Sequence, residues 1–466
     1  MADTFDLTAG WLAEASGGRL VSGDPDTVFA NISIDTRTLP LGALYVAIRG
    51  ERLDGHAFIA DAVARGARGV LVAADAGVPP DAAAVVIEAS DTLAALQSIG
   101  REVRRRSGAV VVAITGSAGK TTTKELAAAL LESRYDVFRN RGNLNNHIGL
   151  PLSLIELKAT PDVAVVELGM NHPGEISLLV ALAEPEIRVW TNVGDAHIGF
   201  FASREEIADA KAEILERART SDRLIINADD PLIVARAKAF RGSVVTFGLS
   251  ETADVRAEDV ISRGIEGTSA TIRTAKGSFD VQVPLVGAGN LLNVLAATAI
   301  ALELNVPLDE IARRVGDLRP AARRGEVIRQ QNGVTLVDDS YNSSPAALMQ
   351  ALAALKDTEA ERRAAVLGEM LELGDHAIAL HEECGRAAAG ARLAWLVTVG
   401  GEPAVAMAQA ARAAGMATDA VEHVPNADEA STAAAGRVRP GDVVLIKGSR
   451  GIGVDRVVTR LKAEAA

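Results

Sequence analysis

A short glycine-containing loop between an apolar segment and a helical segment constrains this chain more than any other feature. The loop reads TGSAGKTT over residues 115–122, after the apolar run at 109–114 and before a helical stretch at 123–132. This layout binds phosphate, because loop N–H groups, a helix N-terminus and a lysine gather around the phosphate oxygens. We therefore expect a nucleoside triphosphate site made by Thr115, Gly116, Ser117, Ala118, Gly119, Lys120, Thr121 and Thr122.

The loop is shorter than the usual phosphate-binding pattern. That pattern places a glycine five residues before the glycine of the Gly-Lys pair. Here the position is occupied by Ile114. Taken alone, a short glycine loop with a lysine is also compatible with an ordinary turn, but its place between a strand and a helix favours a phosphate site.

Composition limits the classes of protein that fit. With 466 residues the chain is too long for one hydrophobic core, and its length favours about three domains. A net charge of -13 and 3% aromatic residues argue against binding to nucleic acid. The single cysteine, Cys384, cannot form an internal disulfide, no apolar run reaches the length of a membrane span, and no signal pattern opens the sequence. We expect a cytoplasmic monomer without a membrane span.

Alternating apolar and helical stretches predict an α/β chain with three domains. A small mixed α/β domain is expected at 1–107, a central parallel-sheet ATPase domain with the phosphate loop at 108–318, and a Rossmann-like domain at 319–466. The β-rich stretch 254–284 predicts an antiparallel addition. The basic stretch 101–106 fits either a linker or the solvated end of a helix. Other expected elements are helices at 56–65 and 291–303 and strands at 43–48, 69–72, 163–168, 188–193, 223–227, 244–247, 335–338, 363–367, 394–399 and 442–446.

Polar side chains follow several of the expected strands, at the edge where open α/β sheets bind ligands. Glu167 ends one strand and is placed to meet Mg²⁺ near Thr121, although a glutamate at a strand end is often only solvated. His197 follows the next strand, where an imidazole is either a metal ligand or a structural hydrogen-bonding group. Lys211 lies in a helical stretch and, taken alone, is most simply a surface lysine.

Two further strand ends lie in the third segment. The sequence DDSYN at 338–342 offers paired carboxylates, which can hold ribose hydroxyls. The sequence KGSR at 447–450 precedes a helix, and this geometry favours anions. A solvated basic turn is the alternative interpretation of that second motif.

Together these motifs resemble those of the Mur ligases of bacterial cell-wall synthesis. The resemblance covers nearly the whole chain and includes the short spacing of the phosphate loop. Its motifs are TGSAGKTT at 115–122, VELG at 166–169, NVGDAH at 192–197, AKAEI at 210–214, DDSYNSSP at 338–345 and KGS at 447–449. Their order and approximate spacing also agree, and several motifs in order are more specific than any one of them.

Three stretches resemble the family member that adds D-alanyl-D-alanine to UDP-N-acetylmuramoyl-tripeptide. They are SIDTR at 33–37 with VAIRGERLDGH at 46–56, GNLNNHIGLPLSL at 142–154, and GEMLELGDH at 368–376. The Asp-Asn-Pro-Arg string with which a relative selects a diamino acid is absent from this sequence. The resemblance implies an ATP-dependent peptide ligase of peptidoglycan precursor synthesis that works through an acyl phosphate.

The resemblance also implies roles for single residues, with ATP and Mg²⁺ as cofactors. The catalytic residues would be Lys120, His197 and Lys211, and CO₂ would carbamylate Lys211 into an anionic metal ligand. The metal ligands would be Thr121, Glu167, His197 and Lys211. Besides the loop, ATP would contact Asn290, Arg324, Asp339, Tyr341 and Asn342. The UDP-N-acetylmuramoyl-tripeptide would contact Asp35, Thr36, Arg37, Asn143, Asn146, Asn171 and His172, and D-alanyl-D-alanine would contact Lys447 and Ser449. For Asn143 and Asn146, ordinary turn chemistry stays open as an alternative.

Other functions stay open at this stage. A sibling ligase would add a diamino acid to the shorter dipeptide precursor, and a folylpolyglutamate-type enzyme would use the same core without a uridine-binding domain. A regulatory ATPase would bind nucleotide without forming an amide bond, and would not need Lys211, His197 and the 447–449 motif together. A kinase is a weaker alternative.

Overall fold

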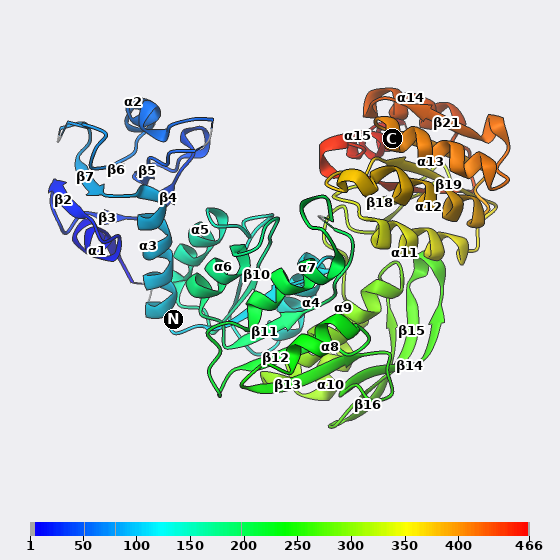
Figure 1. Cartoon of the computed structure of the whole chain (residues 1–466), viewed down its shortest axis with the longest axis horizontal. Helices are drawn as coiled ribbons and strands as arrows, with labels where there is room; N and C mark the ends of the chain where they lie inside the picture. Colours follow the sequence, from blue (N-terminus) through cyan, green and yellow to red (C-terminus); the bar gives the residue numbers. More distant parts are fainter. Residues whose placement is uncertain (1–4, 51, 80, 197, 465–466) are drawn as a thin grey trace. The chain divides into compact units, whose positions relative to one another are not determined.

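The computed structural model describes residues 5–50, 52–79, 81–196 and 198–464 and contains two compact units (Figure 1). The first unit comprises Met1–Ala113, Tyr135–Met170 and Gly174–Ile187. The second comprises Ile114–Arg134, Asn171–Pro173 and Arg188–Ala466. Strands and helices alternate in both units, so the prediction of an α/β chain is confirmed.

The first unit opens with a five-stranded sheet in the order β2-β7-β6-β5-β4. Its strands are β2 (Arg19–Ser22), β4 (Ile32–Ser33), β5 (Leu44–Val46), β6 (Gly69–Ala73) and β7 (Val85–Ala89). All neighbours are parallel except β2 and β7. Tyr45, Val70 and Val86 of this sheet form a buried cluster with Ile59 of helix α2 (Ile59–Ala64). Helix α1 (Ala9–Ala15) and the short pair β1 (Leu7–Thr8) and β3 (Val28–Phe29) complete this region.

The helix predicted at 56–65 divides into two parts. A 3₁₀ turn spans Gly55–Phe58, and α2 begins only at Ile59. Asp54 causes the early turn, because its carboxylate accepts hydrogen bonds from the backbone N–H of His56 at 2.9 Å and from the His56 ring.

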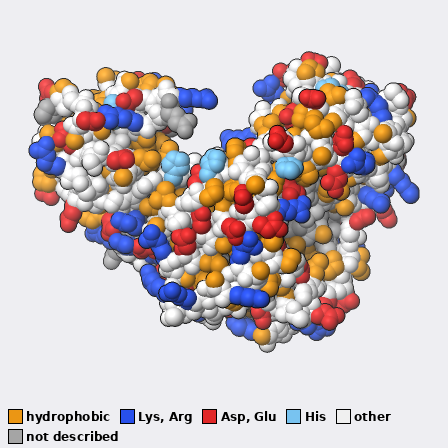
Figure 2. All heavy atoms as spheres, in the orientation of Figure 1, with side chains coloured by type: hydrophobic (Ala, Val, Ile, Leu, Met, Phe, Trp, Pro, Cys, Tyr) orange, Lys and Arg blue, Asp and Glu red, His pale blue; other side chains and the backbone are white. Residues whose placement is uncertain are grey.

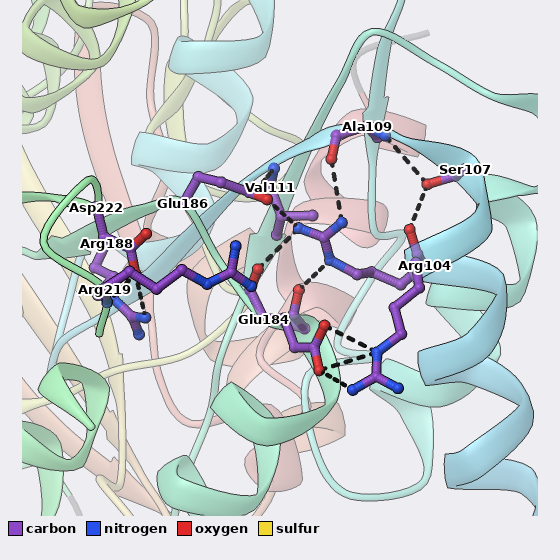
Figure 3. Close-up of polar contacts among 11 residues, drawn as sticks. Arg104, Ser107, Ala109, Val111, Glu184, Glu186, Arg188, Arg219 and Asp222 are labelled. Carbon is purple, nitrogen blue, oxygen red and sulfur yellow. Dashed lines mark hydrogen bonds and ion pairs between the residues drawn. The ribbon is translucent and has the colours of Figure 1, made fainter. Parts of the chain in front are cut away.

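The basic stretch 101–106 lies inside helix α3 (Thr92–Ser107) and is not a linker. Its solvated-end interpretation is also wrong for Arg104, which is buried. The Arg104 guanidinium donates to the carbonyls of Ala183 and Glu184 at 2.7 and 2.8 Å and to Glu186 at 2.6 Å (Figure 3). A weaker bond at 3.4 Å reaches the Ala109 carbonyl. These acceptors explain how a guanidinium can be buried at the end of a helix.

The remainder of the first unit contains the parallel pair β9 (Val137–Arg139) and β10 (Val163–Glu167). Helices α5 (Gly149–Ile155) and α6 (Glu175–Ala183) accompany these strands. Close packing joins α3 to α5, since a Cβ on Gly100 would lie 2.9 Å from Pro151. Strand β8 (Val110–Thr115) passes from the first unit into the second and leads to the phosphate loop.

The second unit continues with parallel strands followed by an antiparallel extension. Strand β11 (Ile187–Trp190) is followed by β12 (Arg223–Asn227) and β13 (Ser243–Gly248), which pair in parallel. Strand β14 (Val255–Ser262) is parallel to β13, and β14, β15 (Thr268–Thr274) and β16 (Gly277–Val283) are antiparallel to one another. This confirms the antiparallel addition predicted at 254–284. The accompanying helices are α4 (Lys120–Leu131), α7 (Arg204–Ala212), α8 (Pro231–Ala237), α9 (Ala288–Glu303) and α10 (Leu308–Val315).

A six-stranded sheet forms the rest of the second unit, in the order β17-β18-β22-β19-β20-β21. Its strands are β17 (Glu326–Arg329), β18 (Thr335–Asp339), β19 (Arg362–Gly368), β20 (Trp395–Val399), β21 (Val421–Val424) and β22 (Asp442–Lys447), and only β17 is antiparallel. Consecutive residues such as Ala365 and Val366 point to opposite faces of the sheet and are both buried, because helices cover both faces. These helices are α11 (Pro345–Lys356), α12 (Ala377–Gly390), α13 (Glu402–Ala413), α14 (Ala427–Arg437) and α15 (Asp455–Glu464) (Figure 1).

Two observations concern the outside of the molecule. Among the described residues, no helix is long and apolar enough to cross a membrane.

Figure 2 shows Lys and Arg side chains interspersed with Asp and Glu on the face in view. That face therefore lacks the continuous basic stripe with which proteins hold nucleic acid.

Candidate active site

Two glycines allow the phosphate loop to fold tightly. Gly116 and Gly119 have φ values of 151° and 79°, in the region that L side chains rarely adopt. A Cβ on Gly116 would lie 1.9 Å from the Thr191 hydroxyl, and one on Gly119 would lie 2.3 Å from Asn293 Oδ1. Because Gly119 turns the chain directly into α4, the helix begins at Lys120, three residues before its predicted start. The N-terminus of a twelve-residue helix thus follows the loop.

Asn192 fixes the shape of the phosphate loop. Its side-chain oxygen accepts from the Ala118 N–H at 2.8 Å, and its amide donates to the Ala118 carbonyl at 3.0 Å. Its backbone carbonyl accepts from the Ser117 N–H at 3.0 Å. The Ser117 hydroxyl in turn accepts from the Gly194 N–H at 2.9 Å. These four hydrogen bonds therefore tie the phosphate loop to the segment that follows β11.

Lys120, Thr121 and Arg324 meet at the start of α4. The Lys120 ammonium donates to the Gly116 carbonyl at 2.7 Å, so the lysine folds over its own loop. The Arg324 guanidinium donates to the Thr121 hydroxyl at 3.1 Å. Two cations thus lie beside the loop N–H groups, which is a suitable arrangement for a polyphosphate.

Asn290 is linked to the first turn of α4 through Asn293. Its side-chain oxygen accepts from Asn293 at 3.1 Å, and its amide donates to the Val286 carbonyl at 2.8 Å. Asn293 Oδ1 accepts from the Thr123 hydroxyl at 3.2 Å. This chain of polar contacts ties the first turn of α9 to the first turn of α4.

Lys211 is buried at the end of α7, with 1% of its surface exposed. Burial, together with the positive charge of Lys120, holds the pKa of the Lys211 amine well below its usual range. The segment after Lys211 is anchored by Arg188, which donates to the Ile214 carbonyl at 2.9 Å. Arg188 also pairs with Asp222 at 3.0 Å (Figure 3). The surface-lysine interpretation is therefore wrong, and Lys211 lies in a low-dielectric environment.

Glu167 ends β10 in the first unit and is buried. Its carboxylate accepts from the Asn145 amide at 2.8 Å, and its backbone N–H donates to Asn140 Oδ1 at 3.0 Å. Asn140 also donates to the Leu144 carbonyl at 2.9 Å. Asn145 thus orients this carboxylate and Asn140 fixes the backbone beside it, so the carboxylate is not simply solvated.

The loop at 142–148 gives its asparagines different roles. Asn146 Oδ1 accepts from the Gly149 N–H at 2.8 Å and from the Ile148 N–H at 3.2 Å, as in the turn interpretation. Asn143 is exposed, and its carbonyl accepts from the Asn145 N–H at 2.8 Å. These turn contacts do not test whether Asn143 and Asn146 bind substrate, so that role stays a prediction.

In the six-stranded sheet, Asp339 lies opposite Lys447 on the adjacent strand. The Lys447 ammonium lies 2.7 Å from the Asp339 carboxylate and donates to the Asn342 carbonyl at 3.0 Å. Burial raises the pKa of the Asp339 carboxyl against the opposing effect of Lys447. The aromatic ring of Tyr341 lies 4.2 Å from the Arg324 guanidinium and 5.8 Å from that of Arg450.

Ser449 is buried and contacts the GEMLELGDH stretch. Its hydroxyl accepts from the Leu371 N–H at 2.9 Å, and its N–H donates to the Glu369 carbonyl at 3.2 Å. The ring of His381 accepts from the Met370 N–H at 2.9 Å. These bonds fix the loop that follows β19.

The remaining predicted residues lie in other places. Asp35 and Arg37 form a bidentate ion pair with distances of 2.6 to 3.2 Å at an exposed 3₁₀ turn that also includes Thr36. The ring of His172 packs against Phe200 with centroids 5.2 Å apart, and Asn171 precedes it. His197 lies outside the described residues.

The Asp35–Arg37 pair predicts a measurable titration. The Arg37 guanidinium and backbone N–H lower the pKa of the Asp35 carboxyl from 3.8 to about 2. The pair therefore contributes above pH 3.8 and is lost as the pH falls toward 2. A carboxyl NMR titration should report about 2 for the unchanged protein, and the Arg37→Gln variant should titrate closer to 3.8. Identical titrations would mean that the pair does not form in solution.

Several residues of these arrangements were missed by the sequence analysis. Asn145, Asn192, Asn293 and Arg188 orient predicted site residues, but a buried asparagine or arginine has no sequence pattern of its own. For Asn192 a signal existed, because it opens the NVGDAH motif that was used only for His197. For Asn145, the repeated asparagines of the 142–146 loop were the only sequence signal of a role in the site.

The comparisons with known proteins agree on one family. Three family models match this chain: Mur ligase family, catalytic domain, at residues 28–129; Mur ligase middle domain at 114–301; and Mur ligase, glutamate ligase domain, at 323–450. The chain is 34% identical to the UDP-N-acetylmuramoyl-tripeptide--D-alanyl-D-alanine ligase of Bacillus subtilis, over 97% of each chain. The ligase of the same name from Escherichia coli is 33% identical, over 98% of this chain and 99% of its own.

Solved structures agree with this result. MurF of Acinetobacter baumannii matches with a TM-score of 0.88 at 30% identity, over 99% of each chain. The MurF ligase of Thermotoga maritima in complex with ADP matches with a TM-score of 0.82 at 29% identity, over 93% of this chain and 97% of its own. The three-domain α/β fold expected from the sequence is thereby confirmed. This chain belongs to the Mur ligase family.

Proposed function

We propose that this enzyme uses ATP to join D-alanyl-D-alanine to UDP-N-acetylmuramoyl-tripeptide in peptidoglycan precursor synthesis. Full-length similarity to ligases with this name carries the proposal. The hydrogen-bonded phosphate loop with Lys120 supports it, because an ATP-dependent ligase must hold a triphosphate.

The chemistry begins with an unreactive carboxylate. The tripeptide carboxylate attacks the γ-phosphate of ATP, and ADP leaves, which produces an acyl phosphate. The amine of the incoming dipeptide then adds to the acyl carbon, and the tetrahedral intermediate expels phosphate to leave an amide. Such a reaction depends mainly on positioning and on neutralising charge. Lys120 and Arg324 beside the loop N–H groups supply that charge for the polyphosphate.

Asn290 of α9 and residues of the third segment bind the rest of the nucleotide in this proposal. Asn290 and Arg324 contact adenine and phosphate, and Asp339, Tyr341 and Asn342 contact the nucleotide. Observed contacts support a common role for two of them, since the Arg324 guanidinium lies over the Tyr341 ring and bonds to Thr121.

Mg²⁺ fits the residues that the family resemblance assigns to it. The Thr121 hydroxyl and the Glu167 carboxylate are oxygen ligands, which hard divalent cations prefer. The buried amine of Lys211 is suited to this role only as a carbamate, which carries a negative charge. Burial lowers the pKa of the Lys211 amine and so favours its neutral form, which is the form that reacts with CO₂. When bound, Mg²⁺ neutralises the negative charge of the phosphates. His197 helps to hold a second Mg²⁺ in this proposal.

Substrate contacts follow from the resemblance alone. Asp35, Thr36 and Arg37 would hold the uridine diphosphate, and the sugar-peptide would contact Asn143, Asn146, Asn171 and His172. Lys447 and Ser449 would meet the dipeptide. We also propose domain boundaries near 107 and 318, a monomeric state, and a cytoplasmic location, which the single cysteine favours.

Dipeptide-dependent phosphate release tests the proposal. The assay contains ATP, Mg²⁺ and UDP-N-acetylmuramoyl-tripeptide, with and without D-alanyl-D-alanine, and mass spectrometry of the product. We expect phosphate release that requires the dipeptide and a product heavier by one D-alanyl-D-alanine less water. Release only with a diamino acid and the shorter precursor would identify the sibling ligase. ATP hydrolysis at a rate that no acceptor changes would identify a regulatory ATPase.

A further inference from the structure

We propose that Lys447 is a positioning residue for the nucleotide, whose ammonium holds the 339–342 loop in its binding shape. This role is additional to any contact with the dipeptide. This inference rests on the proposed function in one respect: the 339–342 loop is taken to bind ATP.

Strand register brings the two partners together. Strands β18 and β22 are parallel neighbours, and Asp339 and Lys447, their last residues, are directly paired. The Lys447 ammonium lies 2.7 Å from the Asp339 carboxylate and 3.0 Å from the Asn342 carbonyl. One cation therefore contacts both ends of a four-residue loop, although 105 positions separate it from Asn342.

Burial gives these contacts their importance. The Lys447 side chain is 4% exposed and the Asp339 side chain 22% exposed. A buried ammonium needs hydrogen-bond acceptors, and both of these acceptors belong to the loop. If Lys447 is removed, the partly buried Asp339 carboxylate loses the ammonium that it contacts, so the loop has to rearrange or the carboxylate has to take up a proton.

The loop between these two contacts carries the groups that would meet the nucleotide. Tyr341 lies in its middle, with its ring against the Arg324 guanidinium at 4.2 Å. The Arg324 guanidinium also donates a hydrogen bond to the Thr121 hydroxyl in the first turn of α4. A displaced loop would therefore shift both the aromatic surface and the arginine that reaches the phosphate loop.

Equilibrium binding of ADP to the full-length protein tests this inference, because it does not depend on turnover. Lys447→Met should raise the Kd for ADP at least about tenfold, since small displacements of positioned groups have large effects. Lys447→Arg, which keeps the charge beside Asp339, should recover most of the affinity. Lys356→Met, at an exposed lysine ending α11, is the matched control and should bind ADP like the unchanged protein.

Two results would overturn the inference. One is an unchanged Kd for ADP in Lys447→Met, even if the KM for D-alanyl-D-alanine rises. The other is an equal loss of ADP affinity in Lys447→Met and Lys447→Arg. If Lys447→Met does not fold, Lys447→Gln is measured under the same criteria, because it keeps a donor for Asn342 without the charge. A failure of dipeptide-dependent phosphate release in the unchanged protein would instead contradict the proposed function and leave the ADP result intact.

Discussion

Replacing Lys211 by alanine is expected to lower kcat for dipeptide-dependent phosphate release about 10²–10³-fold, the usual effect of removing one preorganised charge-stabilising group. The carbamate proposed at this buried position would supply a negative charge that alanine cannot supply. Steady-state kinetics with saturating substrates measure the loss. Because alanine leaves room at the end of α7, a short carboxylate such as acetate should restore part of kcat to this variant.

The control for Lys211 is Lys238→Ala, which removes an exposed lysine after α8 and should leave kcat unchanged. Carbamylation itself is read from the ¹³C resonance of protein equilibrated with ¹³C-bicarbonate, which should be absent from the Lys211→Ala variant. An alanine variant with full activity would eliminate Lys211 as a catalytic residue. If Lys211→Ala loses all activity but the unchanged protein shows no carbamate signal, Lys211 is essential and the carbamate proposal is wrong.

Breaking the buried Arg188–Asp222 pair should cause the largest loss of stability. Both side chains are at most 3% exposed, and Arg188 also bonds to the Ile214 carbonyl. Arg188→Met would leave a buried carboxylate without its partner, which lowers the free energy of unfolding by about 3–5 kcal/mol. Urea unfolding followed by tryptophan fluorescence measures this, because Trp190 is buried on the same strand.

An exposed ion pair provides the comparison. The side chains of Arg456 and Asp428 are 62% and 75% exposed, and Arg456→Met should change the free energy of unfolding by about 0–1 kcal/mol. The double variant Arg188→Met with Asp222→Leu should recover much of the loss, since no unpaired charge remains. Equal losses at the buried and exposed pairs would contradict this account.

Much of the fold could be predicted from the sequence because apolar strands and glycine turns have local signals. The phosphate loop is predictable for this reason, and so is the antiparallel addition at 254–284. The helix at 56–65 is less predictable, because Asp54 caps a 3₁₀ turn first. Arg104 could not be predicted as buried, since its acceptors at 183–186 are distant in the sequence.

Site residues that lie within a sequence motif could be predicted. Residues whose environment depends on tertiary packing could not. Lys211 alone resembles a surface lysine, and only the order of the family motifs singled it out. Its burial depends on how α7 packs. The contact of Lys447 with Asp339 depends on two strands that are far apart in the chain but adjacent in the sheet. Such pairs follow from strand order, and no local pattern encodes strand order.

The contacts of Arg104 have a consequence for dissecting this protein into fragments. All four of its acceptors lie after residue 107: the carbonyls of Ala109, Ala183 and Glu184 and the carboxylate of Glu186. A polypeptide ending at 107 would keep the arginine and lose every group that satisfies it, and α3 would also lose Pro151, against which Gly100 packs. We therefore expect a fragment that ends at residue 107 to be less stable than the same region in the full-length protein, because α3 would lack these partners.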